Sequence, residues 1–414
     1  MAWEIKIGRR LLACMLILSL LSALGLYSAY VIHAVPGSTN TDIFVPWGVM
    51  PAIYAFFVEV STAGLCVLVS LSVVFNLNRF EPIVRRGIWL AIVTILVGLL
   101  VIVLELGRPE RFYYAMLGHV NTSSPMLWSI YLYTVYFIFL VVTALLIFRR
   151  DFALIASRST GVKRLLYRLL ALGTLDTSEE SARRDLRLAA GVGFVALVVG
   201  LSASGNLGNI FGALEHRALW HGPFMPLHAM FSGVASGIAV IILATIIAHW
   251  ARRREMEPKV RMVLLDLRRL LALLIAINLL LVSWKYVVKA WSTSPHLYEA
   301  VETVVRGPLS FEFWSFEIIL GLVVPLAYLI IPRIGKTLPG LLTASFLVLT
   351  GVFAERYIMI VGGLIPPVLP GTPHGVYVPS AMESLFTVGI FALAALISVV
   401  GELLLPLDKP LSAE

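Results

Sequence analysis

The densest group of reactive side chains lies at residues 104–133, LELGRPERFYYAMLGHVNTSSPMLWSIYLY, which joins two apolar runs. Glu105 can exchange a proton, His119 titrates near neutral pH, and Arg108 carries a fixed charge and donates hydrogen bonds. A quinone needs an apolar slot, hydrogen bonds to its carbonyl groups and a nearby proton donor or acceptor. This stretch therefore predicts a quinone site at the mouth of a helix bundle.

Aromatic residues near this stretch suit the same ligand. Trp128 and Tyr131 lie one turn apart on an expected helix and can flank a flat ring. Tyr54 lies near the start of another apolar run, close to the same face. For Trp128 alone, a place in the aromatic belt of the membrane interface is the favoured interpretation. As a set, the tyrosines, tryptophan, histidine and acid still indicate a quinone pocket.

A carboxyl inside an apolar run is the clearest sign of proton chemistry. Glu59 lies twelve residues past Trp47, hence about 18 Å below the interface at a rise of 1.5 Å per residue. A carboxyl at that depth is costly unless it is protonated or paired, which suits a proton relay. The alternative is a neutral glutamic acid that hydrogen-bonds a neighbouring helix.

A second polar set lies in the later half of the chain. Lys285 and Lys289 share one helix face at i, i+4 spacing, and Glu312 and Glu317 enter the next apolar run from the same side. A pair between Lys285 and either acid would satisfy both charges within the membrane. Lys285 and Glu317 therefore form either a structural ion pair or part of a proton path.

Two further groups have a functional and a structural interpretation. Glu355 and Arg356 are neighbours in an apolar run, where a local or interhelical ion pair is favoured. His228 lies five residues into its run and can reach a ligand such as the quinone. A hydrogen-bonded helix histidine is the commoner case.

The elements that must position these residues are membrane helices. The chain has 414 residues, 59% of them hydrophobic and 14% charged, whereas soluble domains carry about 25% charged residues. Apolar runs long enough to cross a bilayer recur throughout, and the first is too long for a signal peptide and lacks a small-residue cleavage site. We expect an all-α polytopic membrane protein of about ten spans, at residues 11–35, 47–77, 86–106, 126–148, 187–212, 224–250, 263–291, 309–331, 338–361 and 382–405.

Basic residues are concentrated in alternate loops, which explains the formal charge of +8 without nucleic-acid binding. The positive-inside rule then predicts a multi-pass protein of the cytoplasmic membrane with both termini in the cytoplasm. Residues 104–133 face outward. Residues 149–187 form the one large cytoplasmic segment, whose basic, amphipathic sequence is typical of a helix lying on the anionic inner leaflet.

A weak internal repeat predicts how the spans are grouped. Met50-Pro51 opens the second span as Met225-Pro226 opens the sixth, and both runs share later positions at equal spacing. This favours two four-helix bundles in a parallel repeat, with a peripheral helix at each end, although chance similarity between apolar helices is the alternative. The expected boundaries are 1–46 for the N-terminal helix, 47–212 and 213–381 for the bundles, and 382–414 for the C-terminal helix.

The histidines and cysteines argue against bound metals. Dihaem membrane subunits need a pair of axial histidines near each leaflet, but only His249 lies near the inner side. One outer haem through His33 and His228 stays a remote alternative. Cys14 and Cys66 both lie in apolar runs, which excludes a cysteine-ligated iron–sulfur cluster or zinc site. We expect no metal in this chain.

The sequence resembles the polysulfide-reductase membrane subunits, the NrfD-like proteins, and in its ten spans the HybB-type branch. The matching stretches follow one another in order through spans two to nine: PWGVMPAIYAFFVEVSTAG at 46–64, LELGRPERF at 104–112, SPMLWSIYLY at 124–133, WHGPFMPLHAMFSGVASG at 220–237, FWSFEIILGLVVP at 313–325 and ERYIMIVGG at 355–363.

The resemblance implies a quinone-reactive anchor subunit of a respiratory oxidoreductase, such as a sulfur or polysulfide reductase or a membrane-bound hydrogenase. Such proteins bind an extracytoplasmic iron–sulfur subunit with four ferredoxin-like clusters, beside a molybdopterin or nickel–iron catalytic subunit. They exchange electrons with menaquinone or another quinone and generally carry no haem. Their pocket maps onto Tyr54, the Glu105–Arg108 corner, His119 and the start of span four. Some members have histidine where this chain has Tyr54.

Two alternatives remain from other classes. The first is a proton or ion transporter of two repeated bundles, against which no broken helix with glycine or proline at midplane is visible in both halves. The second is a passive anchor without a quinone site. Whether this subunit itself counts as an enzyme is left open, since the soluble substrate is set by partner chains.

Overall fold

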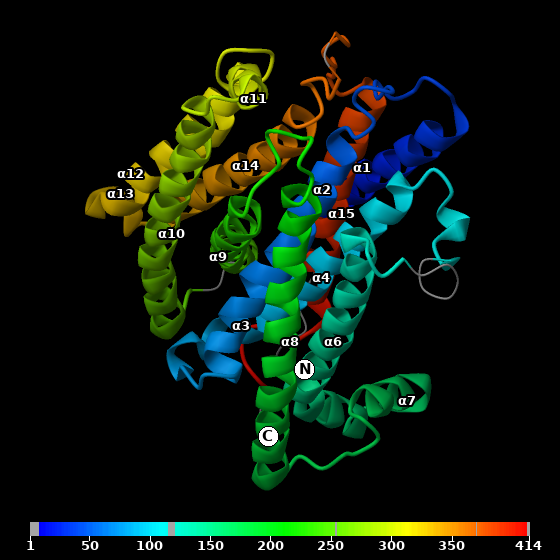
Figure 1. Ribbon diagram of the computed structural model, residues 1–414. Coiled ribbons are helices and arrows are strands. Elements are labelled where there is room, and N and C mark those ends of the chain that lie inside the picture. The colour runs from blue at the N-terminus through cyan, green and yellow to red at the C-terminus, as the bar shows by residue number, and fades with distance from the viewer. Residues whose placement is uncertain (1–7, 115–120, 253–254, 370, 412–414) are drawn as a thin grey trace.

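The computed structural model describes residues 8–114, 121–252, 255–369 and 371–411 of the chain, and Figure 1 shows their arrangement. Within these ranges ten helical stretches are long and apolar enough to cross a membrane, and no strand is formed. A bilayer core offers no water to backbone groups, so long apolar segments satisfy them within helices. The expected all-α polytopic fold is confirmed.

The spans follow the predicted order closely. They are α1 (Arg9–Ala34), α2 (Val49–Glu59) continued by η1 (Val60–Leu65) and α3 (Cys66–Val73), α4 (Glu81–Glu105), α6 (Pro125–Ser157), α8 (Glu179–Gly212), α9 (Phe224–Arg252), α10 (Pro258–Ala290), η4 (Glu312–Val323) continued by α12 (Val324–Ile330), α14 (Leu338–Gly362) and α15 (Ala381–Leu404). The connecting elements are η2 (Asn78–Phe80), η3 (Pro109–Arg111), α7 (Gly161–Leu170), α11 (Pro295–Val305) and α13 (Pro332–Gly335).

The start of α1 and the segment that follows α15 lie at one face of the bundle, which is also the face of α7 (Figure 1). We call it the terminal face and the other the opposite face. The α4–α6 connection and α11 belong to the opposite face, because each follows an odd number of spans. The α1 helix packs along α15, and α6 packs along α8. The division into two repeated four-helix bundles stays a prediction.

Helices α6 and α8 extend farther beyond the terminal face than the expected spans. Arg149 of α6 is buried, and it donates to Asp185 of α8, to Ser181 Oγ at 2.6 Å and to Thr174 Oγ1 at 2.8 Å. This hydrogen-bond network links α6 to α8 and stabilises their extensions. Residues that were expected in a loop because of their charges are therefore helical. The predicted amphipathic helix is α7, whose Leu165 side chain is exposed.

The terminal face is closed by ion pairs to the C-terminal segment. Arg86 of α4 donates to Glu402 Oε1 at 2.6 Å and to Asp408 Oδ1 at 2.7 Å, and Arg252 of α9 pairs with the same two acids. Burial raises the pKa of Asp408, but the attraction of Arg86 and Arg252 outweighs it and holds that pKa below its usual value. Helices α4, α9 and α15 are thereby fastened together.

Two spans contain π-helical segments, and each segment adjoins a buried acid. Glu59 ends α2 just before η1, and Glu317 lies within η4. Glycines next to these segments allow close helix crossings: a Cβ added to Gly237 of α9 would lie 2.4 Å from Gly64, and one on Gly351 of α14 would lie 2.2 Å from Gly321. Small residues at such crossings let membrane helices approach backbone to backbone.

Candidate functional site

A buried arginine forms the centre of a charge cluster inside the membrane region. Arg356 of α14 is fully buried and donates to the carboxylates of Glu59 on α2 and of its neighbour Glu355. It also donates to Ser232 Oγ on α9 at 2.5 Å. A guanidinium can serve several acceptors in one plane, which suits it to join three helices at one point. The expected Glu355–Arg356 pair is therefore both local and interhelical.

The cluster extends toward α10 and η4. His228 Nδ1 of α9 lies 3.3 Å from Glu355 Oε1. Lys285 and Glu317 are buried and within electrostatic range of Glu355 and of each other. Among the described residues no ion pair shorter than 4 Å joins Lys285 to Glu317 or to Glu312. The two groups are near one another without a direct bond.

A small cavity lies between these side chains. Its volume is about 20 Å³, and His228, Asn278, Glu317 and Glu355 line it. Within the described part of the chain, Asn278 Oδ1 and Glu317 Oε2 are buried without a hydrogen-bond partner. The rest of its wall is mainly apolar, and a cavity of this size with a few polar groups accommodates about one water molecule. The arrangement can pass a proton between carboxyl groups and the imidazole over short distances.

The second group of predicted residues lies nearer the opposite face, around two tyrosines. Tyr54 of α2 and Tyr133 of α6 pack edge to face with ring centres 6.2 Å apart, and both are buried. The Tyr133 hydroxyl lies near Tyr54 and Ser129, yet it makes no hydrogen bond of normal geometry with a described residue. Ser129 accepts a hydrogen bond from Asn206 of α8 at 2.9 Å. Two buried phenols thus lie close to a half-buried amide.

The start of α2, which positions Tyr54, is held by a loop residue. The Tyr377 hydroxyl accepts a hydrogen bond from the Val49 backbone N–H at 2.9 Å and donates one to Glu383 Oε1 at 2.8 Å. Burial and the neighbouring Glu383 carboxylate raise the pKa of Tyr377 well above its usual value, so the phenol keeps its proton. A Cβ added to Gly48 would lie 2.2 Å from this hydroxyl, which explains the glycine there.

The remaining predicted residues are more peripheral. Glu105 is half-buried at the end of α4, and Arg108 is exposed just after it; no ion pair joins them among the described residues. Trp128 is exposed and donates to the Thr122 carbonyl at 2.9 Å, while Tyr131 is half-buried. His119 lies outside the described residues.

Sequence reasoning missed two residues near Tyr54. Tyr133 and Asn206 do not stand out, because a tyrosine in an aromatic helix and an asparagine in a glycine-rich one are common. For Arg356 the expected structural ion pair is present, and Glu59 is a second acidic partner that the sequence did not indicate. His228, grouped by sequence with the quinone residues, lies in the charge cluster beside Glu355.

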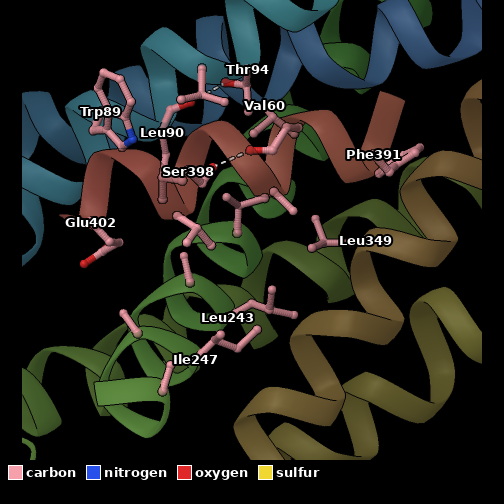
Figure 2. Close-up of a pocket in the computed structure, with 18 of the residues that line it drawn as sticks. Val60, Trp89, Leu90, Thr94, Leu243, Ile247, Leu349, Phe391, Ser398 and Glu402 are labelled. Carbon is pink, nitrogen blue, oxygen red and sulfur yellow. Dashed lines mark hydrogen bonds between the residues drawn. The ribbon is translucent and has the colours of Figure 1, made fainter. Parts of the chain in front are cut away.

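Two larger cavities lie elsewhere. One of about 870 Å³ lies in the half of the bundle toward the terminal face and is shown in Figure 2. Another of about 530 Å³ opens at the opposite face between Trp47, Arg217 and Trp220. Neither is lined by Tyr54 or Tyr131. Across the described ranges, no group of three or more histidine, cysteine or acidic residues is arranged to hold a metal ion.

In the described part of the chain, ten spans with a charge cluster buried among them define a polytopic helical membrane protein with ionisable groups in its membrane-spanning helices. The chain belongs to the family described as polysulphide reductase, NrfD, which matches residues 37–367.

Similar proteins come from bacteria and archaea. The chain is 24% identical over 408 residues to a selenate reductase subunit of Mesobacillus selenatarsenatis, covering 94% of this chain and 93% of that protein. It is 28% identical over 405 residues to the Hdr-like menaquinol oxidoreductase integral membrane subunit of Archaeoglobus fulgidus, covering 94% and 91%. It is 26% identical over 341 residues to protein NrfD of Escherichia coli, covering 78% and 98%.

Proposed function

We propose that this chain is the quinone-reactive membrane subunit of a respiratory oxidoreductase, which passes electrons between an extracytoplasmic iron–sulfur subunit and a membrane quinone. The observation that carries this proposal is the buried Tyr133 hydroxyl without a partner beside Tyr54. An unsatisfied buried phenol costs about 1–3 kcal/mol, and a quinone carbonyl would satisfy it. The quinone supplies the two-electron redox chemistry when bound. The name of the archaeal menaquinol oxidoreductase relative supports this ligand class.

The chain's own residues would bind and orient this ligand. Tyr54 and Tyr133 would donate hydrogen bonds to one carbonyl group, and Tyr131 and Trp128 would form the wall toward the membrane. Glu105, half-buried at the mouth, would exchange protons with the site. Arg108 and His119, predicted from the sequence, remain part of the proposed pocket.

Protons would move through the charge cluster. Glu59 is close to both groups, since it bonds to Arg356 and lies near enough to Tyr54 for an electrostatic interaction. From there the acids Glu355 and Glu317, with Lys285 as the nearby base, offer successive proton positions across α14, η4 and α10. His228 would contribute at the small cavity rather than at the quinone.

The proposed orientation rests on the distribution of basic residues among the loops. The terminal face would be cytoplasmic, because it carries most of the loop arginines and the basic helix α7. The opposite face would then be extracytoplasmic and would bind the iron–sulfur subunit, which in turn contacts a molybdopterin or nickel–iron catalytic subunit. The relatives named as selenate reductase and menaquinol oxidoreductase subunits favour such a complex.

The test is quinol-linked electron transfer in the purified complex. Tyr133→Phe and Tyr54→Phe should each lower the rate about tenfold, because one charge-stabilising hydrogen bond is worth about 1–2 kcal/mol. Tyr136→Phe is the matched control: Tyr136 lies one turn farther along α6, is buried, and already donates to the Ser61 carbonyl at 2.9 Å. Unchanged rates in both test variants and in Glu105→Gln would refute the proposed site.

The runner-up function is proton or ion transport without redox chemistry. The buried charge cluster is the observation that favours it. Ion flux in proteoliposomes that contain this chain alone, with no quinol and no partner subunits, would support transport. Flux that requires quinol turnover by the whole complex would support the oxidoreductase.

A further inference from the structure

One large cavity between the described helices has no part in the proposed quinone chemistry. It lies among α2, α4, α9, α14 and α15, is closed by the start of α1, and has a volume of about 870 Å³ (Figure 2). That volume is within the range of ligand pockets, about 300–1,000 Å³. We call it the terminal-half groove. At one end lie Arg9, Arg252 and Glu402 of the terminal face.

The other end of the groove is closed by phenylalanines. Phe56, Phe57, Phe353 and Phe391 interlock, with ring centres 5.0–6.0 Å apart. On α14, which runs from the terminal face inward, Phe353 lies one helical turn before Arg356, so this ring lies between the groove and the charge cluster along that helix.

Three hydroxyls along the groove donate hydrogen bonds within their own helices, and Trp89 Nε1, which also lines the groove, is buried without a partner among the described residues. Thr94 donates to the Leu90 carbonyl at 2.8 Å, Thr350 to the Phe346 carbonyl at 3.1 Å, and Ser398 to the Ala394 carbonyl at 2.7 Å. Figure 2 shows Thr94 and Ser398 bonded in this way along their own helices. A buried water needs two to four polar partners, so an apolar cavity of this kind stays dry. The groove is therefore not built as a proton half-channel.

The hydrocarbon chains of membrane lipids can enter the terminal-half groove. Ile247 of α9 and Phe346 of α14 line the groove and are 43% and 61% exposed on spans that face the membrane. The groove is thus open sideways to acyl chains. Its lining atoms would lose dispersion contacts if it stayed empty, and a flexible chain restores them.

We propose that the terminal-half groove binds one phospholipid from the leaflet at the terminal face, with an acyl chain inside and the anionic phosphate at Arg9. Arg9 is exposed at the mouth, whereas Arg252 is committed to Glu402 and Asp408. Anionic headgroups are attracted to basic residues at this depth. The bound acyl chain excludes water from the phenylalanine plug, formed by Phe56, Phe57, Phe353 and Phe391. Water therefore does not reach the charge cluster from the terminal half of the bundle.

The test measures lipid that stays with the purified complex after extensive detergent washing, by mass spectrometry. Ala244→Phe and Ala395→Phe, both in the groove lining, should lower retained phospholipid about tenfold, because the added rings occupy the acyl-chain space. Ala276→Phe, exposed on α10 outside the groove, is the matched control and should retain lipid. Arg9→Gln should shift the retained lipid from anionic to zwitterionic species, whereas Arg184→Gln, exposed on α8, should not.

A second measurement uses the unaltered chain. Phosphatidylglycerol with a photoreactive group near the end of its acyl chain should crosslink to Leu243, Leu349 or the phenylalanine plug. Crosslinks spread evenly over all lipid-facing helices would overturn the proposal. Equal lipid retention in the groove-filling variants and in Ala276→Phe would also overturn it. Recovery of a quinone instead of a phospholipid from the groove would overturn the assigned occupant.

Discussion

Replacing Arg356 tests whether the charge cluster holds the helices together. In Arg356→Met the side chain keeps its length and apolar stem but loses the bonds to Glu59, Glu355 and Ser232. Two carboxyl groups are then left in a buried site without their cation. They must either stay charged at a high desolvation cost or take up protons.

The expected loss of stability is large. Removing one partner of a buried ion pair costs about 3–5 kcal/mol, because the remaining charge is uncompensated. Adding Glu59→Gln to Arg356→Met removes one of the two stranded acids and should recover about 1–3 kcal/mol, the usual coupling between directly contacting groups. The double variant should thus be more stable than the single one.

The assay is denaturation of the purified protein in detergent, followed by loss of helical signal. The control is Arg79→Met, because Arg79 pairs with Asp266 while its own side chain is 62% exposed. An exposed pair contributes about 0–1 kcal/mol, so this variant should lie close to the unaltered protein.

Two results would refute the reasoning. The first is an Arg356→Met variant that loses no more stability than Arg79→Met. The second is a Glu59→Gln change that lowers stability by equal amounts with and without Arg356, which would show that the two side chains do not interact.

Three further predictions concern other parts of the molecule. Arg86 and Arg252 hold the pKa of Asp408 in the folded protein below its usual 3.8. The ionised Asp408 carboxylate therefore stabilises the fold by about 1 kcal/mol at any pH above 3.8. This stabilisation is lost as the pH falls through the lower pKa of the folded state. Melting curves of Asp408→Asn should therefore differ from those of the unaltered protein at about pH 6 but converge near about pH 2. Gly351→Val should prevent η4 from packing on α14, since even a Cβ would lie 2.2 Å from Gly321; near-normal yield and thermal stability would contradict this. Glu317→Gln should lower kcat about tenfold or more with KM for quinol unchanged, measured by steady-state turnover, and a raised KM would instead implicate quinol binding.

The spans were predictable because hydropathy is a local property. The ten helices begin and end near the expected residues, except where the Arg149–Asp185 pair extends α6 and α8. The sequence also identified Glu59, Lys285, Glu317 and His228 as unusual, since an ionisable group in an apolar run is costly wherever the helix packs.

What surrounds those residues was not predictable from the sequence. Glu59 and Arg356 are 297 positions apart, and no spacing rule connects residues on different helices. Their contact depends on close crossings such as that of Gly64 with Gly237, where α9 meets the span of Glu59. The pairing of Tyr54 with Tyr133 depends in the same way on how α6 lies beside α2.

The sequence by itself therefore determined that this is a polytopic membrane protein with ionisable groups in its helices, and the described residues form ten such spans, because bilayer thickness and the cost of buried charge act on each segment separately. Only the tertiary structure decided that Arg356 joins Glu59 to Glu355, that His228 belongs to this cluster, and that the terminal-half groove is lined by satisfied hydroxyls. Those features arise from packing between helices, where distances of a few ångströms separate an ion pair from an isolated charge.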